Sequence, residues 1–310
     1  MACGSPITRP SVRPPGTEPE PARRPVQRQA AREPTWRRRA LADPGRWLLY
    51  VLLVAFTLFS VFPFVYSVLT SLKAQAFAPG LIPHPATFEH YRDLLTASPL
   101  FLRWVLNSLI VATVSVIVLG LLSLLGGYAL ARIPFFGRQA VFVIMLASMM
   151  IPGQVLWIPN YATLSELGWI NTWWALIPGL VGSLTSGIFL VSQFLKALPV
   201  ELEEAAELDG LSRFGTFWRI VLPLAGPAIA AVSITGFMAS WNMFAWPVIV
   251  LDSPRLFTLP VGLNFFKGLH VTQWTLIMAG SMFNTIPVLL VFIFFQRYFI
   301  KGIAMAGMKE

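Results

Sequence analysis

The sequence predicts an all-α, polytopic membrane protein with six transmembrane helices. Only 12% of its 310 residues are charged, whereas a soluble domain carries about 25%. The apolar fraction is 56% and the mean hydropathy is +0.67, so a soluble protein of this composition would lack the polar surface that keeps it in solution. Six stretches of 26 to 32 residues contain no charge, and each exceeds the roughly 20 apolar residues with which a helix crosses a bilayer.

The six uncharged stretches give the order of the helices. They lie between Arg46 and Lys73, Arg103 and Arg132, Arg138 and Glu166, Glu166 and Lys196, Arg219 and Asp252, and Lys267 and Arg297. We expect helices at 47–72, 104–130, 139–162, 170–195, 222–250 and 273–297. Helices are favoured over a barrel because the stretches are apolar throughout, whereas barrel strands alternate in polarity.

The N-terminal segment differs in composition from the rest of the chain. Residues 1–46 hold ten arginines and nine prolines, which cannot bury a core and predict a disordered tail. We interpret this tail as a solvated topological anchor. Contact of its basic run at 36–39 with anionic lipid is an alternative, and nucleic-acid binding is disfavoured. Residues 47–299 then form the transmembrane domain, and 300–310 form a short C-terminal tail.

The distribution of basic residues predicts the orientation. Six spans place both termini on the same side, where the tails and connecting segments hold 18 Lys and Arg residues against five on the opposite side. The positive-inside rule therefore predicts that both termini are cytoplasmic.

Few residues are available for catalysis or metal binding. The one cysteine, Cys3, excludes a disulfide framework and a thiolate cluster, and three histidines (His84, His90 and His270) make a metal site improbable. The chain has no Gly-x4-Gly-Lys-Ser/Thr loop to cradle a triphosphate. No charged residue lies inside a predicted span, whereas proton-driven carriers place titratable groups there. We expect a transport subunit that is not an enzyme and binds no cofactor of its own.

The segment 196–223, on the predicted cytoplasmic side, carries the most specific pattern. Pro199 suits the first turn of a helix and Gly210 suits its left-handed end. Leu202, Ala205 and Ala206 are spaced to share one face of that helix. A second short helix follows, with its bulky residues on one side, namely Phe214, Phe217, Trp218 and Val221.

This helix–glycine–helix element has two interpretations. Its small and aromatic faces suit the docking of a soluble partner. An interfacial hairpin that lies on lipid is the alternative, but the segment holds five acidic residues against three basic ones, which disfavours an anionic membrane surface. We prefer docking.

The same segment resembles the EAA loop of ABC importer permeases. The resemblance rests on Glu204, Ala205, Ala206, Asp209 and Gly210, followed by Ile220, Leu222 and Pro223. Further stretches resemble the carbohydrate-uptake, maltose-type branch, namely 107–111, 128–132, 241–244, 257–263 and 296–302. The resemblance covers roughly 47–307. The chain departs from the family pattern at Met243, where an acidic or polar residue is usual, and at its last five residues.

The resemblance implies a function and a set of partners. It implies the type I importer permease architecture in a bacterial plasma membrane and ATP-driven carbohydrate uptake. The partners would be a second, homologous permease, a dimer of ATP-binding cassette subunits that binds the ATP, and an extracytoplasmic solute-binding protein. Glu204 would supply a charged contact to the ATPase, Ala205 and Ala206 the close approach, and Gly210 the turn. We call segment 196–223 the coupling loop.

Polar residues inside the predicted spans are candidates for the translocation path. They are Asn107, Ser108, Gln154, Asn160, Ser240, Asn242, Ser281, Asn284 and Thr285. Hydrogen bonds between helices are the alternative role for each of them. Trp241 beside Asn242 is the best candidate because an indole face could stack on a sugar ring, and Asn284 is the third residue that we assign to the path.

Three alternatives remain at this point. The chain could be an ABC permease for a non-sugar solute such as a phosphorylated polyol. It could be a secondary carrier that works without ATP, or a membrane scaffold that transports nothing.

Overall fold

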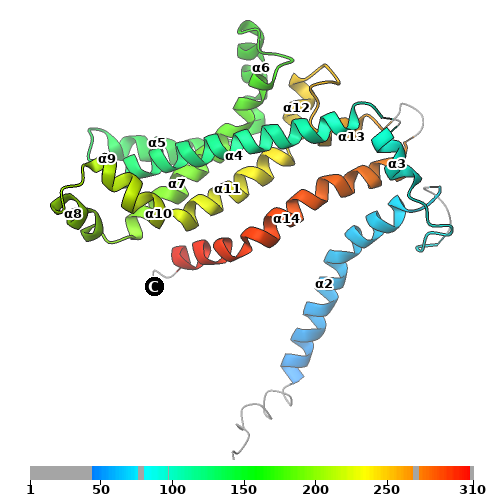
Figure 1. Ribbon diagram of the computed structural model, residues 1–310, viewed down its shortest axis with the longest axis horizontal. Helices are drawn as coiled ribbons and strands as arrows, with labels where there is room; N and C mark the ends of the chain where they lie inside the picture. Colours follow the sequence, from blue (N-terminus) through cyan, green and yellow to red (C-terminus); the bar gives the residue numbers. More distant parts are fainter. Residues whose placement is uncertain (1–43, 76–79, 97, 268–271, 308–310) are drawn as a thin grey trace, which may run out of the picture. The chain divides into compact units, whose positions relative to one another are not determined.

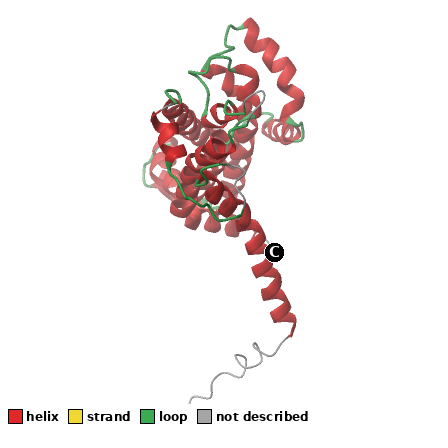
Figure 2. Ribbon diagram, turned by 90° about the vertical axis from the view of Figure 1, so that its right-hand side faces the viewer, coloured by secondary structure: helices red, strands yellow, loops and turns green. Residues whose placement is uncertain are grey.

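The computed structural model describes residues 44–75, 80–96, 98–267 and 272–307. Within this part of the chain the structure consists of helices and loops, with isolated bridges but no strands (Figure 2), which confirms the all-α prediction. The chain divides into two compact units, Met1–Ser60 and Val61–Glu310. Nearly all of the predicted N-terminal tail, residues 1–43, lies outside the described residues.

Sixteen helical elements follow one another in the described part of the chain (Figure 1). The α-helices are α2 Pro44–Ser71, α3 Glu89–Thr96, α4 Phe101–Arg132, α5 Arg138–Met149, α6 Trp157–Glu166, α7 Val181–Ala197, α8 Glu201–Leu208, α9 Arg213–Thr216, α10 Leu222–Leu224, α11 Gly226–Trp241, α12 Ala245–Val250, α13 Leu259–Asn264 and α14 Trp274–Gly307. Two 3₁₀ helices, η1 Gly153–Leu156 and η2 Trp173–Leu180, and a π-helix, η3 Phe217–Val221, complete the set.

Four of these helical segments are each long and apolar enough to cross a membrane. They are α2, α4, η2 continued by α7, and α14. Two further candidates are bent pairs, 138–149 with 153–166 and 213–224 with 226–241, which are bent by 93° and 69°. The described chain therefore holds up to six spans, the predicted number, when each bent pair is counted as one span.

The prediction of continuous third and fifth helices is wrong. The third helix ends at Met149, because Pro152 lacks the N–H that a continuing helix would need. The fifth is broken at Ala225, which lies between Pro223 and Pro227, and it ends at Trp241 instead of residue 250. At the other end of the chain, α14 continues as helix to Gly307, through most of the expected C-terminal tail.

The bundle is built around α4. Helices α7 and α11 both pack along α4, and α14 packs against α11 (Figure 1). The elements α8 to α10 lie at one end of this bundle, and α3 and α13 lie at the other (Figure 1). A buried hydrophobic cluster holds each end together: one includes Phe101, Trp104 and Trp241, and the other includes Phe217 and Val221.

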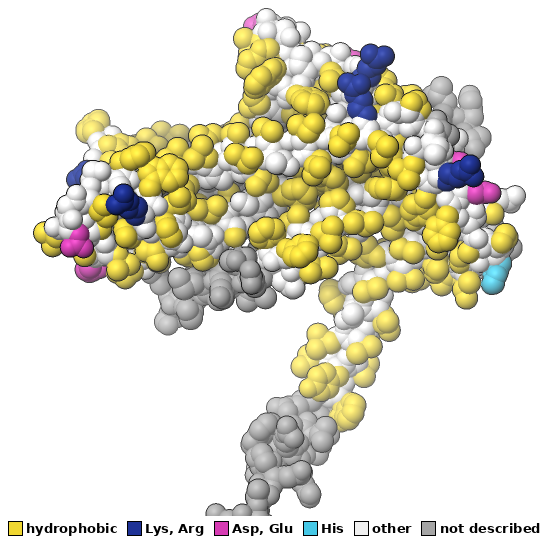
Figure 3. All heavy atoms as spheres, in the orientation of Figure 1, with side chains coloured by type: hydrophobic (Ala, Val, Ile, Leu, Met, Phe, Trp, Pro, Cys, Tyr) yellow, Lys and Arg dark blue, Asp and Glu magenta, His cyan; other side chains and the backbone are white. Residues whose placement is uncertain are grey.

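The surface of the bundle matches a membrane-spanning protein. On the face drawn in Figure 3, hydrophobic side chains cover the middle of the bundle, and charged side chains gather toward its ends. On α4, for example, Leu106, Val114 and Ile117 are each more than half exposed. Contact of such side chains with lipid acyl chains is favourable, whereas their exposure to water is unfavourable.

Close packing of α4 and α7 depends on Gly127. A β-carbon at this position would lie 2.6 Å from Val191 Cγ1 and 3.0 Å from the backbone nitrogen of Ser192. We expect Gly127→Ala to lower the apparent melting temperature of the purified protein in detergent, because the two helices must move apart. Gly182→Ala is the matched control, since no atom of the described residues lies within 4 Å of a β-carbon there. Equal melting temperatures for the two variants would contradict this packing.

Candidate functional site

The coupling loop folds as a helix, a glycine turn and a second helix, as the sequence predicts. Helix α8 begins at Glu201, two residues after Pro199, and carries acidic residues in its first turn, where the helix dipole stabilises them. Gly210 then adopts a φ of +87°, a conformation that favours glycine. The Ser212 hydroxyl caps α9 by accepting a hydrogen bond from the Gly215 N–H at 3.2 Å.

The residues expected to share one face of α8 are divided by the structure. Ala206 is buried within the chain and Ala205 and Leu202 are exposed, so the expectation that both alanines face a partner is wrong for Ala206. Glu204 and Leu208 are exposed as well, and the Leu208 side chain is 89% exposed. The exposed surface of α8 therefore includes Glu204, Ala205 and Leu208.

The bulky residues that follow are also divided. Phe217 and Val221 enter the buried cluster formed with α4, α7 and α11, and the Phe217 ring meets Tyr128 edge-on with 5.0 Å between the ring centroids. Phe214 and Trp218 point outward, being 73% and 44% exposed. The loop is thus anchored in the bundle through two residues and exposes the other two.

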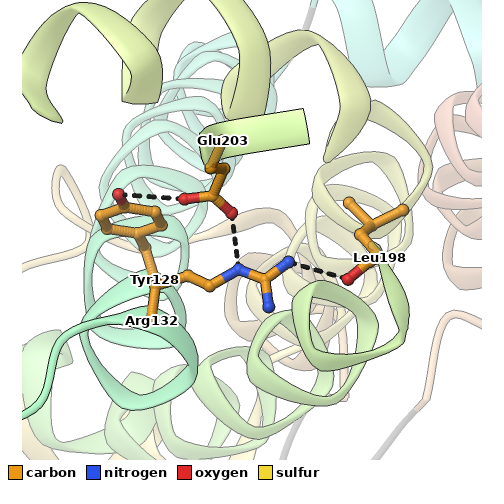
Figure 4. Close-up of polar contacts among 4 residues, drawn as sticks. All are labelled: Tyr128, Arg132, Leu198 and Glu203. Carbon is orange, nitrogen blue, oxygen red and sulfur yellow. Dashed lines mark hydrogen bonds and ion pairs between the residues drawn. The ribbon is translucent and has the colours of Figure 1, made fainter. Parts of the chain in front are cut away.

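A polar linkage joins α8 to the end of α4 (Figure 4). Arg132 Nε donates to Glu203 Oε1 at 2.5 Å, and Arg132 Nη2 donates to the Leu198 carbonyl oxygen at 2.9 Å. The Tyr128 hydroxyl donates to Glu203 Oε2 at 3.3 Å. The Arg132 and Glu203 side chains are only 13% and 14% exposed, so solvent screens their attraction less than that of a surface pair.

The contact of Glu203 with Arg132 was not predicted from the sequence. The resemblance implies a different contact, from Glu204 to the ATPase, and the structure leaves Glu204 exposed on the outer face of α8. The spacing of Tyr128 and Arg132 was the sequence feature that could have indicated this contact. Residues four apart lie on the same face of a helix, so these two side chains can reach one carboxylate together.

The remaining predicted coupling-loop residues lie in the segment of the chain that connects α8 to α11. The Asp209 N–H donates to the Ala205 carbonyl oxygen at 3.0 Å and caps α8. Ile220 is half-buried in the π-helix η3, and Leu222 packs against the buried cluster. Pro223 is exposed just before the 69° bend. Short π-helical turns are frequent at functional sites.

The three predicted path residues lie together at the end of α11. Trp241 is only 1% exposed, its Nε1 donates to the Asn284 carbonyl oxygen at 2.9 Å, and its ring stacks on Phe237. Its indole face is therefore covered in this structure, contrary to the expected open stacking surface. Asn242 is exposed, and its Oδ1 accepts a hydrogen bond from Asn284 Nδ2 at 3.3 Å.

Comparisons with known proteins agree with this architecture. Residues 122–305 match the family described as "Binding-protein-dependent transport system inner membrane component". The arabinooligosaccharides transport system permease protein AraQ of Halalkalibacterium halodurans is 35% identical over 270 residues, which cover 85% of this chain and 96% of that protein. The trehalose/maltose transport system permease protein MalG of Thermococcus litoralis is 30% identical, over 85% of this chain and 97% of that protein.

A solved structure shows the same fold. It is a bacterial ABC transporter involved in the import of the acidic polysaccharide alginate, and it matches with a TM-score of 0.69 and 24% sequence identity, over 81% of this chain and 95% of the matched chain. With the apolar helices described above, these matches identify a multi-pass membrane protein. The chain belongs to the family of binding-protein-dependent transport system inner membrane components.

Proposed function

We propose that this chain is the permease subunit of an ABC importer that moves a carbohydrate across the plasma membrane with ATP hydrolysed by a separate subunit. The coupling loop carries the proposal, because it presents an exposed helix that is fastened to the bundle at two places. Family membership supports the transport role, and the names of the relatives, which include arabinooligosaccharide and trehalose/maltose permeases, support the substrate class.

The proposed assembly follows from what the chain lacks and what it exposes. No loop in the sequence can cradle a triphosphate, so we assign ATP binding to a dimer of ATPase subunits. A second, homologous permease would complete the translocation path, and an extracytoplasmic binding protein would deliver the substrate. The excess of basic residues on that side of the sequence supports a cytoplasmic location for the coupling loop and both termini, where ATP would be available.

The exposed side of the coupling loop suits a protein partner better than lipid. Its acidic residues Glu201, Glu204, Glu207 and Asp209 are all exposed and would be repelled by anionic headgroups. The coupling loop also exposes Leu208, Phe214 and Trp218. Large apolar side chains rimmed by charges are typical of protein–protein interfaces.

The two anchors explain how movement of the ATPase would reach the membrane. A displacement of α8 would be transmitted to α4 through the Glu203–Arg132 pair, and to α7 and α11 through Phe217 and Val221. Packed helices move as rigid bodies between discrete arrangements. ATP-driven closure of the ATPase dimer would therefore switch the access of the path from one side of the membrane to the other.

Uptake into proteoliposomes tests the proposed function. The chain is reconstituted with its co-expressed partner permease, ATPase and binding protein, and labelled neutral trisaccharides are supplied on the side of the binding protein. We expect uptake that requires ATP on the opposite side. Uptake driven by an ion gradient without ATP would identify a secondary carrier. Import of a phosphorylated polyol alone would exclude a carbohydrate as the substrate. If no solute is imported, the result would support a membrane scaffold instead of a transporter.

A further inference from the structure

A hollow with several polar side chains on its lining lies at the break in the third span. It has a volume of about 650 Å³ and is enclosed by the bend from α5 through η1 into α6, by η2 and α7, and by the start of α12. Non-helical backbone at membrane depth is tolerated where it is buried or lines a water-filled cavity, and transporters build substrate sites at such interruptions. The volume falls within the range of roughly 300–1,000 Å³ that is typical of small-molecule sites.

Two amides on the lining have no partner in the described part of the chain. Gln154 is exposed, Asn160 is half-buried, and neither side chain forms a hydrogen bond with another described residue. Asn107 behaves differently, since its Nδ2 donates to the carbonyl oxygens of Arg255 and Phe257, both at 2.9 Å. An amide within an uncharged span needs water, a ligand or a second protein chain to satisfy it, and each amide can both donate and accept, as sugar hydroxyls do.

Two tryptophan side chains line the hollow together with these amides. Trp246 is buried and held by a 2.8 Å hydrogen bond from its Nε1 to the Ala175 carbonyl oxygen. The half-buried Trp157 packs near it, with 6.3 Å between the ring centroids, and also lines the hollow. A rigid apolar surface with a few convergent polar groups is the usual composition of a ligand site. It suits a sugar ring, which has apolar faces and a polar edge.

No charged side chain lines the hollow in the part of the chain that the structure describes. None of its lining residues is Asp, Glu, Lys, Arg or His, so a phosphate or a carboxylate would enter without a counter-charge, at a high desolvation cost. Two other hollows are less suitable. One, of about 460 Å³ between α4 and η2–α7, is almost entirely apolar, and the other, near α3, includes the carboxylate of Asp93.

We propose that this hollow is the surface with which the chain contacts a neutral saccharide in transit. Gln154 and Asn160 hydrogen-bond to the sugar hydroxyls, and Trp157 packs on a ring face. The inference rests on the proposed function and adds to it a site and a selectivity for uncharged sugars.

Removal of both amides tests the site. Gln154→Leu combined with Asn160→Leu is compared with Gln193→Leu, which changes an exposed glutamine of α7 that does not line the hollow. In the reconstituted transporter we expect about tenfold slower uptake of maltotriose, arabinotriose or galactotriose by the double variant, with ATP hydrolysis within twofold of wild type. Unchanged uptake would overturn the site and leave the proposed function intact, whereas absence of ATP-driven uptake of any carbohydrate by the wild type would contradict the proposed function itself.

Cysteine labelling provides a second readout that does not depend on turnover. Asn160→Cys is prepared with Cys3→Ser and treated with a charged, water-soluble thiol reagent in the reconstituted transporter. We expect rapid modification that the transported neutral trisaccharide slows at least threefold and that a uronic acid trisaccharide does not slow. An unreactive cysteine, covered by lipid or by the partner permease, would overturn the inference, as would equal protection by the acidic and neutral sugars.

Discussion

Glu204→Lys is expected to lower ATP-driven uptake by at least about thirtyfold while the protein still inserts into the membrane. Glu204 lies on the exposed side of α8, where we propose that the ATPase docks. Reversal of a charge at the centre of a docked interface costs about 2 kcal/mol or more, which corresponds to about thirtyfold in affinity. The measurement is uptake per amount of inserted protein in proteoliposomes.

Gly210→Leu is expected to have a similar effect through the backbone. A β-carbon at Gly210 meets no atom of the described chain within 4 Å, but the φ of +87° strains any residue with a side chain, at a cost of about 1–3 kcal/mol. The turn should relax and move α8 away from its docking position.

Matched controls separate docking from a general loss of stability. Glu166→Lys makes the same charge reversal at the end of α6. Gly168→Leu places a side chain at a φ of +68°, where no described residue lies within 4 Å of the β-carbon. Both controls should transport within twofold of wild type. Full transport by Glu204→Lys, or equal losses in the variants and their controls, would contradict the docking role.

Arg132→Glu is expected to uncouple transport from ATP hydrolysis. It places two carboxylates together at the junction of α4 and α8, in a linkage whose side chains are about 13–14% exposed. We expect a penalty between the roughly 0.5 kcal/mol of an exposed pair and the 3–5 kcal/mol of a fully buried one. The number of sugars moved per ATP hydrolysed should fall at least tenfold, because α8 can then move without α4.

The charge swap provides the control for this linkage. Arg132→Glu combined with Glu203→Arg restores opposite charges and should recover a substantial part of the coupling ratio, although the hydrogen bond to the Leu198 carbonyl oxygen is lost. Arg132→Lys should be intermediate, since lysine keeps the charge without the two-pronged geometry. If the swap couples as poorly as Arg132→Glu, or if Arg132→Glu couples normally, the pair does not transmit movement.

The order of the spans, and their number when each bent pair is counted as one span, could be predicted from charge alone, because placing a charge in the hydrocarbon core is costly. Their continuity could not. The composition of a whole uncharged stretch does not show where a single residue such as Pro152 interrupts the helix. The adjacent Pro152-Gly153 pair is nevertheless a recognisable sequence signal for a helix break. The helix break near Trp241 had no such signal, since the next proline is Pro247.

The coupling loop shows a similar division between what the sequence predicts and what it leaves open. Spacing was sufficient to predict a helix, a glycine turn and a second helix. It could not show that Glu203 and Ala206 face the bundle while Glu204 and Ala205 face outward. Spacing sets the angle of about 100° between neighbouring residues, but it does not set how the whole helix is rotated against the bundle. That rotation is set by the tertiary contacts of Arg132, Phe217 and Val221.

Site-specific crosslinking from Leu208 tests the central claim most directly. A photoreactive amino acid replaces Leu208, whose side chain is 89% exposed on α8, and the crosslinked products from native membranes are identified by mass spectrometry. The account predicts an adduct with an ATP-hydrolysing subunit, which should be absent when the same group replaces Leu167 beyond the end of α6. Adducts with lipid alone, or with proteins that hydrolyse no ATP, would contradict it.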